Sequence, residues 1–461
     1  MSEMRMGFRL LAGLVTVCLL WSVLQGTQKK KKKAPSDTRP NLLLVTFDTT
    51  RADRLPPYGY NGIKTPALSR LASEGVTFLQ VHSQSPQTLP SHTSLFTGLY
   101  TITHNVRSNG QRLEPNAITL AEVLRAEGYQ TGAVVATAAL MEDFGLGQGF
   151  QTYNDDFEDP AISSAIKTVF RFFSRNKINL YSTRPANRVS TLARRWLNRT
   201  AKKGRPFFLW VHFFDPHTPY LHHPDFDRPN LKRKSGTKNR YGELEKNYLN
   251  EIEFADHYLG KLLNHLDKLG LSSNTLVAFT ADHGESLGEH GYSGHRGELY
   301  EDIIRIPLML RFPGRLKAGQ RLDTPAMSID VAPTLLKLLS IDFPDSAFAG
   351  EDLFALDPQK PRRCYSLAVK LFTKSPIRTA LLYGGYKYIQ FDNPSHNQFF
   401  HLSQDPQEGS NLVESSPLPE PGLDWAAAIQ DWFDRYEELT VSDFEMTAEQ
   451  MERLRSLGYI Q

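Results

Sequence analysis

Cysteine is scarce in this chain, which contains only Cys18 and Cys364 among its 461 residues. Cys18 lies in an apolar run near the N-terminus, so the body of the protein carries a single thiol. A disulfide framework and a cysteine-based zinc cluster are therefore both excluded. The 31 glycines and 28 prolines are an ordinary share of the sequence, which excludes a collagen-like or a mainly low-complexity chain.

A large excess of charge of one sign is also missing. The formal net charge is +3, and residues 1–38 contribute seven Lys and Arg against two Asp and Glu. The remaining residues hold 46 basic and 48 acidic side chains. Bulk electrostatics therefore does not direct the body towards polyanions, and we expect no nucleic-acid partner. The length is sufficient for one large packed core and a smaller second domain.

Beyond the N-terminus the sequence has no long hydrophobic run. Residues 10–24 are uncharged and mostly apolar, and they follow Arg5 and Arg9. This layout is typical of a signal-peptide core and is slightly short for a membrane-spanning helix. Five lysines at 29–33 directly after the run resist translocation. We expect export to the periplasm or the extracellular space, or membrane association through residues 10–24, with an inverted anchor as the alternative.

Short apolar runs alternate with amphipathic segments along most of the chain. Residues 41–47, 131–136, 206–214 and 275–280 are typical of strands buried on both faces of a parallel sheet. Helix-start signals precede residues 65–75 and 119–128, where Thr119 and Glu122 form a capping box. From residue 248 to 269 an apolar stripe predicts a long helix. The pattern indicates an α/β fold.

After residue 339 the pattern changes to short segments separated by Gly, Asn and Pro. Residues 365–369, 379–383, 387–391 and 399–402 predict a small antiparallel sheet. Amphipathic segments near 425–436 and 448–457 predict two helices that complete the chain. We place a linker before residue 39 and expect folding to begin near Asn41.

Two of the expected strands end in an aspartate. Asp48 follows the first strand, and Asp282, with His283 beside it, follows the strand at 275–280. Ligands in open α/β sheets collect at the carboxyl ends of strands, so both aspartates could face one crevice. Together the three side chains offer oxygen and nitrogen ligands for a divalent cation. The alternative for each aspartate is a simple turn or helix cap.

A third element is the sequence TLPSHTSLFTG at residues 88–98, which indicates a turn running into a helix. The hydroxyl of Thr88 would lie at the positive end of the helix dipole, where an anionic substrate is favoured. A coordinated metal would lower its pKa enough to make it a nucleophile. The alternative is that Thr88 and Ser91 only cap the helix.

These motifs occur in a fixed order with three others: Asn109 in RSNG, DPHTPY at 215–220, and HLSQDPQEGSNL at 401–412. With Asp48, residues 88–98 and DHGESLGEHG at 282–291, the set closely resembles the sulfatase family of the alkaline phosphatase superfamily. The resemblance implies an alkaline-phosphatase-like α/β domain with a mixed central sheet between helices, and a small C-terminal domain with a four-stranded antiparallel sheet. We expect a signal or anchor and linker at 1–38, the catalytic domain at 39–362, and the C-terminal subdomain with a helical tail at 363–461.

The resemblance also implies roles for individual residues. Thr88 matches the nucleophile, and Asn109 matches a residue that binds a nonbridging oxygen of the substrate. His217 and His295 match positions that face the leaving group or the anion, and His92 takes the place of an arginine that steadies the nucleophile. The implied metal ligands are Asp48, Thr88, Asp282 and His283. Four other histidines have no such support and stay outside the expected site: His212, His222, His223 and His290.

The residue at position 88 departs from the family pattern. Sulfatases need a Cys or Ser that is oxidised to formylglycine in a Cys-x-Pro-x-Arg setting, and here Thr88 and His92 occupy the two key positions. We therefore expect no formylglycine. A sulfated threonine lacks the second hydroxyl that expels sulfate, whereas a phosphothreonine can be cleaved by in-line attack of water. Thr49 replaces a second aspartate and His283 a carboxamide ligand, which favours one manganese or zinc ion over calcium.

The leading hypothesis is a metal-dependent hydrolase of phosphate mono- or diesters that acts through a covalent Thr88 intermediate. The alternatives are a sulfatase that uses unmodified Thr88, a phosphoglycerol or phosphoethanolamine transferase, and an inactive glycan-binding protein. The expected substrate is a small or a glycan- or lipid-linked sulfate or phosphate ester, selected by loops at 155–195 and 225–240. The sequence leaves the oligomeric state open.

Overall fold

The structure is a computed structural model that describes residues 38–157, 182–200, 204–221, 223, 226, 240–295, 297–344, 347–369, 376–413, 423–436 and 446–457. The expected export or anchor segment at 10–24 and the lysines at 29–33 lie outside these ranges, as do 158–181 and 227–239 of the expected specificity loops. Within the described ranges, no helix combines the length and the apolarity needed to cross a membrane.

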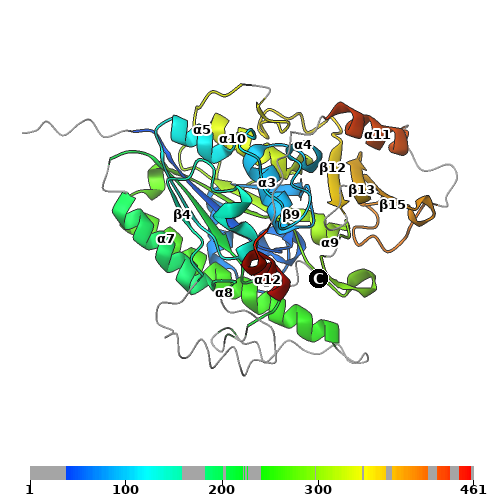
Figure 1. Cartoon of the computed structure of the whole chain (residues 1–461), viewed down its shortest axis with the longest axis horizontal. Coiled ribbons are helices and arrows are strands. Elements are labelled where there is room, and N and C mark those ends of the chain that lie inside the picture. The colour runs from blue at the N-terminus through cyan, green and yellow to red at the C-terminus, as the bar shows by residue number, and fades with distance from the viewer. Residues whose placement is uncertain are drawn as a thin grey trace, which may run out of the picture. The chain divides into compact units, whose positions relative to one another are not determined.

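A nine-stranded sheet lies at the centre of the described chain (Figure 1). Its order is β10-β2-β9-β6-β1-β5-β3-β4, and β11 also pairs with β2. The central strand β1 is parallel to both β5 and β6, whereas β9 is antiparallel to β2 and β6. The sheet is therefore mixed, as the resemblance implied. The strand bounds are β1 (Asn41–Phe47), β2 (Val76–His82), β3 (Gln130–Val134), β4 (Thr152–Asn154), β5 (Phe207–Phe213), β6 (Thr275–Ala281), β9 (Arg305–Arg311), β10 (Gln320–Leu322) and β11 (Ala326–Met327).

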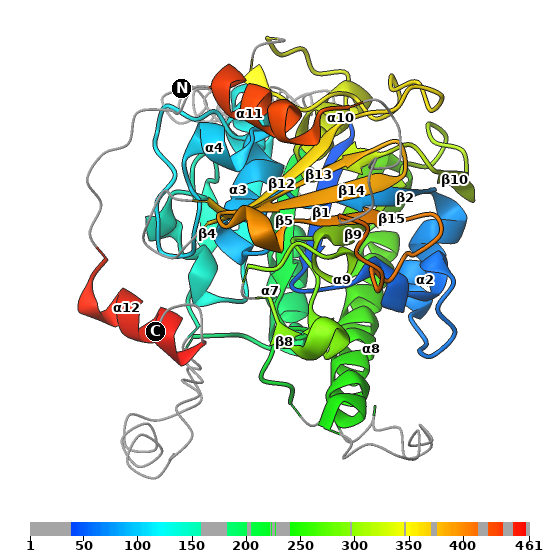
Figure 2. The same cartoon turned by 90° about the vertical axis from the view of Figure 1, so that its right-hand side faces the viewer.

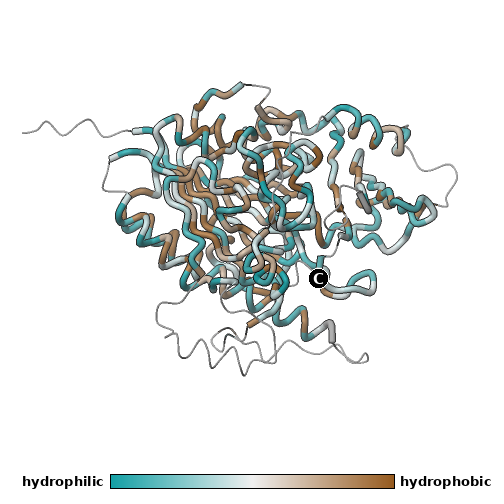
Figure 3. Tube along the Cα trace, in the orientation of Figure 1, coloured by the Kyte–Doolittle hydropathy of each residue, from teal (hydrophilic) through white to brown (hydrophobic). Residues whose placement is uncertain are grey.

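The three middle strands of the sheet are buried along their whole length. Every residue of β1, β5 and β6 is inaccessible to solvent or nearly so, and Figure 3 shows hydrophobic residues concentrated along these strands. Helices cover both faces of the sheet, so each strand needs apolar side chains on both sides, which explains the continuous apolar runs in the sequence. The sequence prediction of these strands is confirmed.

Strands β2 and β9 were not predicted, and Pro307 gives one reason. A proline cannot donate a ladder hydrogen bond, so its presence argues against a central strand. In the structure, β9 lies between β2 and β6, but the register of β2 shifts between Phe78 and Val81. Pro307 falls opposite this irregularity, because Leu308 pairs with Phe78 and Ile306 with Val81. Its carbonyl oxygen accepts a hydrogen bond of 2.8 Å from Thr280 Oγ1.

Two groups of helices cover the two faces of the sheet (Figures 1 and 2). In one group, α2 and α7 each contact α8; in the other, α4, α5 and α10 each contact α3. The capping box predicted at Thr119 and Glu122 opens α5. The predicted apolar stripe of α8 is buried, although α8 begins before residue 248. The bounds are α2 (Pro66–Glu74), α3 (Thr88–Thr97), α4 (Thr101–His104), α5 (Leu120–Ala126), α7 (Ala186–Thr200), α8 (Arg240–Lys268), α9 (Glu301–Ile304) and α10 (Val331–Leu338).

Helix α7 corrects one sequence expectation. Residues 186–195 were assigned to a substrate-selecting loop, but they belong to this helix. Its buried face includes Val189, Ala193 and Leu197, at spacings of four residues, and it packs against α8 and β5. The apolar spacing was visible in the sequence but was outweighed by the many charged residues around it. This part of the segment is scaffold and does not form a loop at the site.

A separate four-stranded antiparallel sheet follows the large one and confirms the predicted fold class. Its strands are adjacent in the order of the sequence, and α11 packs against it through Trp425 and Trp432 (Figure 1). The core of this sheet is distinct from that of the large sheet. The bounds are β12 (Cys364–Val369), β13 (Pro376–Tyr383), β14 (Tyr386–Phe391), β15 (Gln398–His401), α11 (Trp425–Arg435) and α12 (Ala448–Ser456).

Candidate active site

The two strand-end aspartates meet at one edge of the central sheet. Asp48 follows β1 and Asp282 follows β6, and these strands are adjacent and parallel, with Phe47 opposite Ala281. One ligand atom each of Asp48, Asp282 and His283 lies within 4.8 Å of the other two. All three side chains are fully buried. The expectation that both aspartates face a common point therefore agrees with the geometry.

The hydrogen bonds around Asp282 and His283 leave two lone pairs facing each other. Asp282 Oδ1 accepts bonds from the backbone N–H groups of Thr49 (3.0 Å) and His283 (2.8 Å). His283 Nδ1 lies 2.9 Å from the carbonyl oxygen of Gly284, so Nδ1 carries the proton and Nε2 a lone pair. Nε2 is 3.4 Å from Asp282 Oδ2, and neither atom has a hydrogen-bond partner. Two buried acceptors that face each other are the arrangement that a bound cation satisfies.

Both oxygens of Asp48 are buried without a hydrogen-bond partner as well. Burial, together with the nearby charges of Asp282 and Glu285, raises the pKa of Asp48 well above its usual value. Burial also raises the pKa of Asp282 and lowers that of His283 to about 3, so the imidazole is neutral and able to bind a metal. These residues fit a divalent cation, and two carboxylates with one imidazole suit manganese or zinc.

Thr49 adopts a strained backbone conformation directly after Asp48. Its φ angle is +49°, in the left-handed region that β-branched residues avoid. The conformation turns the Thr49 N–H towards Asp282 Oδ1, and the Thr49 carbonyl accepts a bond of 2.9 Å from Tyr248 Oη. Strain of this kind costs on the order of 1–3 kcal/mol and persists where the surroundings hold it. Here it orients the carboxylate that faces His283.

Thr88 is the first residue of α3, and the helix is buried over its whole length. In its first turns, Ser91 Oγ donates to the carbonyl oxygen of Asp282 at 2.6 Å, and His92 Nδ1 lies 3.8 Å from Asp282 Oδ2. The start of α3 is therefore held directly against the carboxylate cluster. A helix N-terminus such as the one that Thr88 occupies favours an anion.

His92 links the nucleophile position to the core of the sheet. Its Nδ1 donates to the carbonyl oxygen of Thr88 at 2.8 Å, and its Nε2 lies 3.1 Å from Thr46 Oγ1. Trp210 Nε1 donates to the same hydroxyl at 3.0 Å, so this hydroxyl donates its own proton to His92. Burial lowers the pKa of His92, which agrees with a neutral ring. His92 is therefore a positioning residue for Thr88 and supplies no positive charge.

Asn109 lies in a turn that contacts the start of α3. Its Oδ1 accepts a hydrogen bond of 2.8 Å from the backbone N–H of Leu89, and its own N–H donates to Gln87 Oε1 at 3.0 Å. Because Oδ1 faces the protein backbone, the amide nitrogen is the end that Asn109 can offer to a substrate oxygen. This orientation suits the role that the resemblance implied.

His217 and His295 form a pair, although they are far apart in sequence. His217 follows β5, and His295 follows the hairpin of β7 (Ser286–Leu287) and β8 (Ser293–Gly294); their Nε2 atoms are 3.0 Å apart. Each Nδ1 contacts a backbone carbonyl oxygen, of Thr218 and of Pro86 respectively, so each Nδ1 is protonated. With both Nδ1 atoms protonated, the two Nε2 atoms form a hydrogen bond when one further proton lies between them.

The shared proton makes this pair a suitable acid. Burial and the neighbouring His295 lower the pKa of His217 to about 3, which favours the neutral form of the His217 ring. The ring of His295 also lies 4.3 Å from that of His283, centroid to centroid, which places the pair beside the carboxylate cluster. An imidazolium next to an anionic substrate can protonate a leaving oxygen.

His212 is a site residue that the sequence analysis left out. It pairs with Thr46 in the register of β5 and β1, and its Nε2 lies 3.4 Å from Asp48 Oδ2. Its Nδ1 accepts the backbone N–H of Ala136 at 3.3 Å, so Nε2 carries the proton that points to Asp48. The sequence feature that could have indicated His212 is its place as a polar residue inside the apolar run at 206–214. Only the register of β5 against β1 shows that it faces Asp48.

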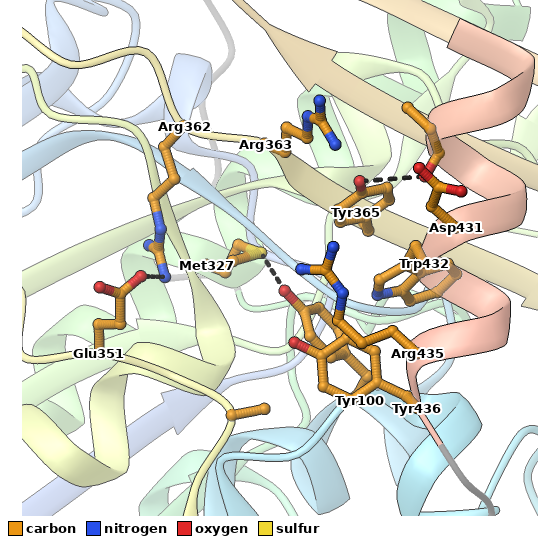
Figure 4. Close-up of a pocket in the computed structure, with 12 residues that line it drawn as sticks. Tyr100, Met327, Glu351, Arg362, Arg363, Tyr365, Asp431, Trp432, Arg435 and Tyr436 are labelled. Atoms are coloured by element: carbon orange, nitrogen blue, oxygen red, sulfur yellow. Dashed lines mark hydrogen bonds and ion pairs between the residues drawn. The ribbon is translucent and has the colours of Figure 1, made fainter. Parts of the chain in front are cut away.

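A pocket at the other sheet involves none of the predicted site residues. It lies between β12 and α11 and is lined by residues that include Tyr100, Arg362, Tyr365 and Trp432 (Figure 4). Tyr365 and Trp432 stack with their ring centroids 4.7 Å apart. Arg362 is paired with Asp330 and Glu351, so its charge is neutralised within the protein. We assign this pocket no part in the chemistry.

The sequence and the fold are similar to those of several known proteins. The sulfatase family model matches residues 40–341, and the model of the C-terminal region of N-sulphoglucosamine sulphohydrolase matches residues 288–420. The ulvan-active sulfatase of Formosa agariphila is 26% identical over 435 residues, covering 87% of this chain and 82% of that protein. The multifunctional alkaline phosphatase superfamily protein PehA of Trinickia caryophylli is 25% identical, covering 86% and 95%. The crystal structure of a phosphonate monoester hydrolase of Agrobacterium radiobacter superimposes with a TM-score of 0.68 at 21% identity, covering 86% of this chain and 94% of that one.

Proposed function

Because the chain belongs to the sulfatase family of the alkaline phosphatase superfamily and is an ester hydrolase of that family, we propose that its preferred reaction is the cleavage of phosphate mono- or diesters through a covalent Thr88 intermediate. The observation that carries this proposal is Thr88 itself, at the start of a buried helix held against Asp282. A threonine hydroxyl cannot become the aldehyde hydrate that releases sulfate, but it can carry and release a phosphoryl group.

The residues around Thr88 divide the work of this reaction. A divalent cation held by Asp48, Asp282 and His283 would lower the pKa of the Thr88 hydroxyl and neutralise charge on the substrate. Thr88 Oγ1 attacks phosphorus as the bond from phosphorus to the leaving oxygen breaks. The amide nitrogen of Asn109 donates to a nonbridging oxygen. His92, bonded to the Thr88 carbonyl, keeps the attacking residue in place.

The histidine pair handles the protons in both halves of the reaction. In the first half, the proton shared by His217 and His295 passes to the leaving oxygen, so that an alcohol departs. In the second half, water attacks phosphorus opposite Thr88, and its proton restores the pair. The Thr88–phosphorus bond breaks and phosphate is released. Each half reverses the protonation state that the other leaves behind.

Sulfate ester cleavage by unmodified Thr88 is the second candidate. It is favoured by the match to the sulfatase family model and by the sequence similarity to an ulvan-active sulfatase. In this case water must attack the sulfur of a sulfated Thr88, because the residue has no second hydroxyl to expel the group. The site geometry is otherwise the same, so the two candidates differ in how readily the covalent intermediate is resolved.

Initial rates on three nitrophenyl esters distinguish these candidates. We expect the protein, loaded with manganese or zinc, to cleave nitrophenyl phosphate or bis-nitrophenyl phosphate at least about 10-fold faster than nitrophenyl sulfate, which corresponds to about 1.4 kcal/mol of transition-state discrimination. The three substrates are compared at equal concentration, with calcium as a third metal. Sulfate cleavage alone would contradict the phosphate proposal and favour the second candidate. If none of the three nitrophenyl esters is cleaved, both the phosphate and the sulfate proposals are contradicted for simple esters.

The histidine pair leads to a separate prediction about leaving groups. His217→Ala and His295→Ala should lower the rate on an alkyl phosphate by about 10²–10⁴-fold, because an alkoxide needs a proton to depart. The rate on nitrophenyl phosphate should change far less, because nitrophenolate leaves without one. His396→Ala, which changes an exposed histidine of the small sheet region, is the control. Equal losses on both substrates would show that the pair does not act as the leaving-group acid.

A further inference from the structure

A second group of potential metal ligands lies outside the carboxylate cluster described above. Asp215 follows β5, His223 lies in the loop after it, and Glu251 lies on α8. One ligand atom of each residue lies within 4.8 Å of the other two. His223 Nε2 is 2.7 Å from Glu251 Oε2. None of the six motifs assigned a role to His223 or Glu251.

The hydrogen bonds of this group leave an acceptor without a partner. Asp215 Oδ1 accepts the backbone N–H of Ala186 at 2.8 Å, whereas Oδ2 is buried without a hydrogen-bond partner. Asp215 is 8% exposed and the Glu251 side chain is 1% exposed. Glu251 Oε1 accepts the backbone N–H of Leu221. Both oxygens of Glu251 have partners, so the unpartnered acceptor of this described group is Asp215 Oδ2, which is buried beside a second carboxylate.

The environment of the imidazole supports its use as a ligand. The ring of His223 stacks on that of Phe254 with centroids 3.6 Å apart and planes at 9°, which fixes its direction towards Glu251. The His223–Glu251 separation is 2.7 Å and all three ligand atoms lie within 4.8 Å of one another, a range that includes the spacing of about 3.4 Å between ligands that each lie about 2.1 Å from a tetrahedral cation. One nitrogen and two carboxylate oxygens are a donor set that zinc and manganese accept.

We propose that Asp215, His223 and Glu251 hold a second divalent cation, of the zinc or manganese type, which ties the loop after β5 to helix α8. The loop between Asp215 and His223 carries His217, whose Nε2 lies 3.0 Å from His295. A cation at this position binds one residue before His217 in the sequence, Asp215, and one after it, His223. It therefore holds the proton-donating pair in place, an effect that rests on the function proposed above.

The metal content of purified variants tests the site without reference to activity. After dialysis against zinc and removal of free metal, we expect two equivalents in the wild type and one each in Glu251→Gln and Asp282→Asn. Glu251→Gln keeps an oxygen that can accept the Leu221 N–H and removes only the charge. Glu253→Gln, a change of the same type two residues along α8, is the matched control and should keep two equivalents. One equivalent in the wild type, or two in Glu251→Gln, would overturn the proposal.

A second measurement guards against a variant that fails to fold. Titration of zinc into Asp282→Asn by calorimetry should show one remaining site, because the carboxylate cluster of Asp48, Asp282 and His283 is disabled while Asp215, His223 and Glu251 are intact. An Asp282→Asn protein with native circular dichroism and no zinc binding would contradict the second site.

The link to His217 is tested by its own readout. If the wild type hydrolyses phosphate esters, Glu251→Gln should lower the rate on an alkyl phosphate by about 10-fold or more while changing the rate on nitrophenyl phosphate by much less, as His217→Ala does. Equal losses on both substrates would overturn the role of the cation in positioning His217. The existence of the metal site is then judged from the metal content alone. If the wild type cleaves no phosphate ester, the proposed function fails, but the metal stoichiometry still reports on the site.

Discussion

Replacing Thr88 by alanine is expected to lower kcat/KM for the best ester substrate by about 10⁴-fold or more, with the fold unchanged. The variant removes the only atom that can form the covalent intermediate, while His92 continues to bond to the backbone carbonyl at this position. The measurement is steady-state kinetics together with circular dichroism. Residual activity above about one tenth would contradict the nucleophile assignment.

Two comparisons make this result specific to the hydroxyl of Thr88. Thr88→Ser keeps a nucleophile and should retain measurable turnover, whereas Thr93→Ala removes a hydroxyl that only donates to the carbonyl of Leu89 in the same helix. Thr93→Ala should change the rate by a few-fold at most and cost about 1 kcal/mol of stability. Mass spectrometry of protein quenched during turnover should find one phosphoryl group on the peptide that contains Thr88, and none in Thr88→Ala.

Replacing Asp282 by asparagine is expected to lower kcat/KM by about 10³-fold, which corresponds to about 4 kcal/mol of transition-state stabilisation. Asparagine keeps an oxygen for the N–H groups of Thr49 and His283 but removes the charge that faces the His283 lone pair. Chelation of the wild type should have a similar effect. Adding back manganese or zinc should restore more activity than adding calcium, because the ligand set includes an imidazole.

The same variant should have an unusual effect on stability. In the metal-free protein, burial raises the pKa values of Asp48 and Asp282, and the charge of Asp282 raises that of Asp48 further, so removing one charge should leave the melting temperature unchanged or raise it. The increase in melting temperature that manganese or zinc produces in the wild type should shrink in the variant. Asp256→Asn, which replaces one of the two buried oxygens that accept backbone N–H groups by an amide nitrogen, should instead be destabilised with metal affinity retained. A metal-dependent stabilisation equal to that of the wild type would contradict the ligand role of Asp282.

Several parts of the fold and the site followed from short stretches of sequence. The strands β1, β5 and β6 could be predicted because a strand that is buried on both faces needs an apolar residue at nearly every position. This requirement applies to each residue independently of distant parts of the chain. Asp48 and Asp282 were visible because each directly follows such a strand. The small antiparallel sheet was visible from its turns. In each case the physical requirement concerns residues that are neighbours in the chain.

Other parts were hidden because they depend on contacts between distant segments. Pro307 is acceptable in a central strand only because an irregularity of β2, more than 220 residues earlier, lies opposite it. Residues 186–195 read as a polar loop until the packing partners of α7 were known. His212 reads as one polar residue in a buried strand, and nothing local to it indicates that its Nε2 faces Asp48.

The sequence by itself determined which residue types end the buried strands, that position 88 carries a hydroxyl and no oxidisable cysteine or serine, and that the chain forms an α/β domain followed by a small antiparallel sheet. Only the tertiary structure decided that the lone pairs of Asp282 and His283 face each other, that the Nε2 atoms of His217 and His295 meet, and that Asp215, His223 and Glu251 converge. The reason is physical. Hydrophobic burial is specified residue by residue, whereas a lone pair or a proton is assigned by the atom it faces, and strand register and loop closure bring that atom from elsewhere in the chain.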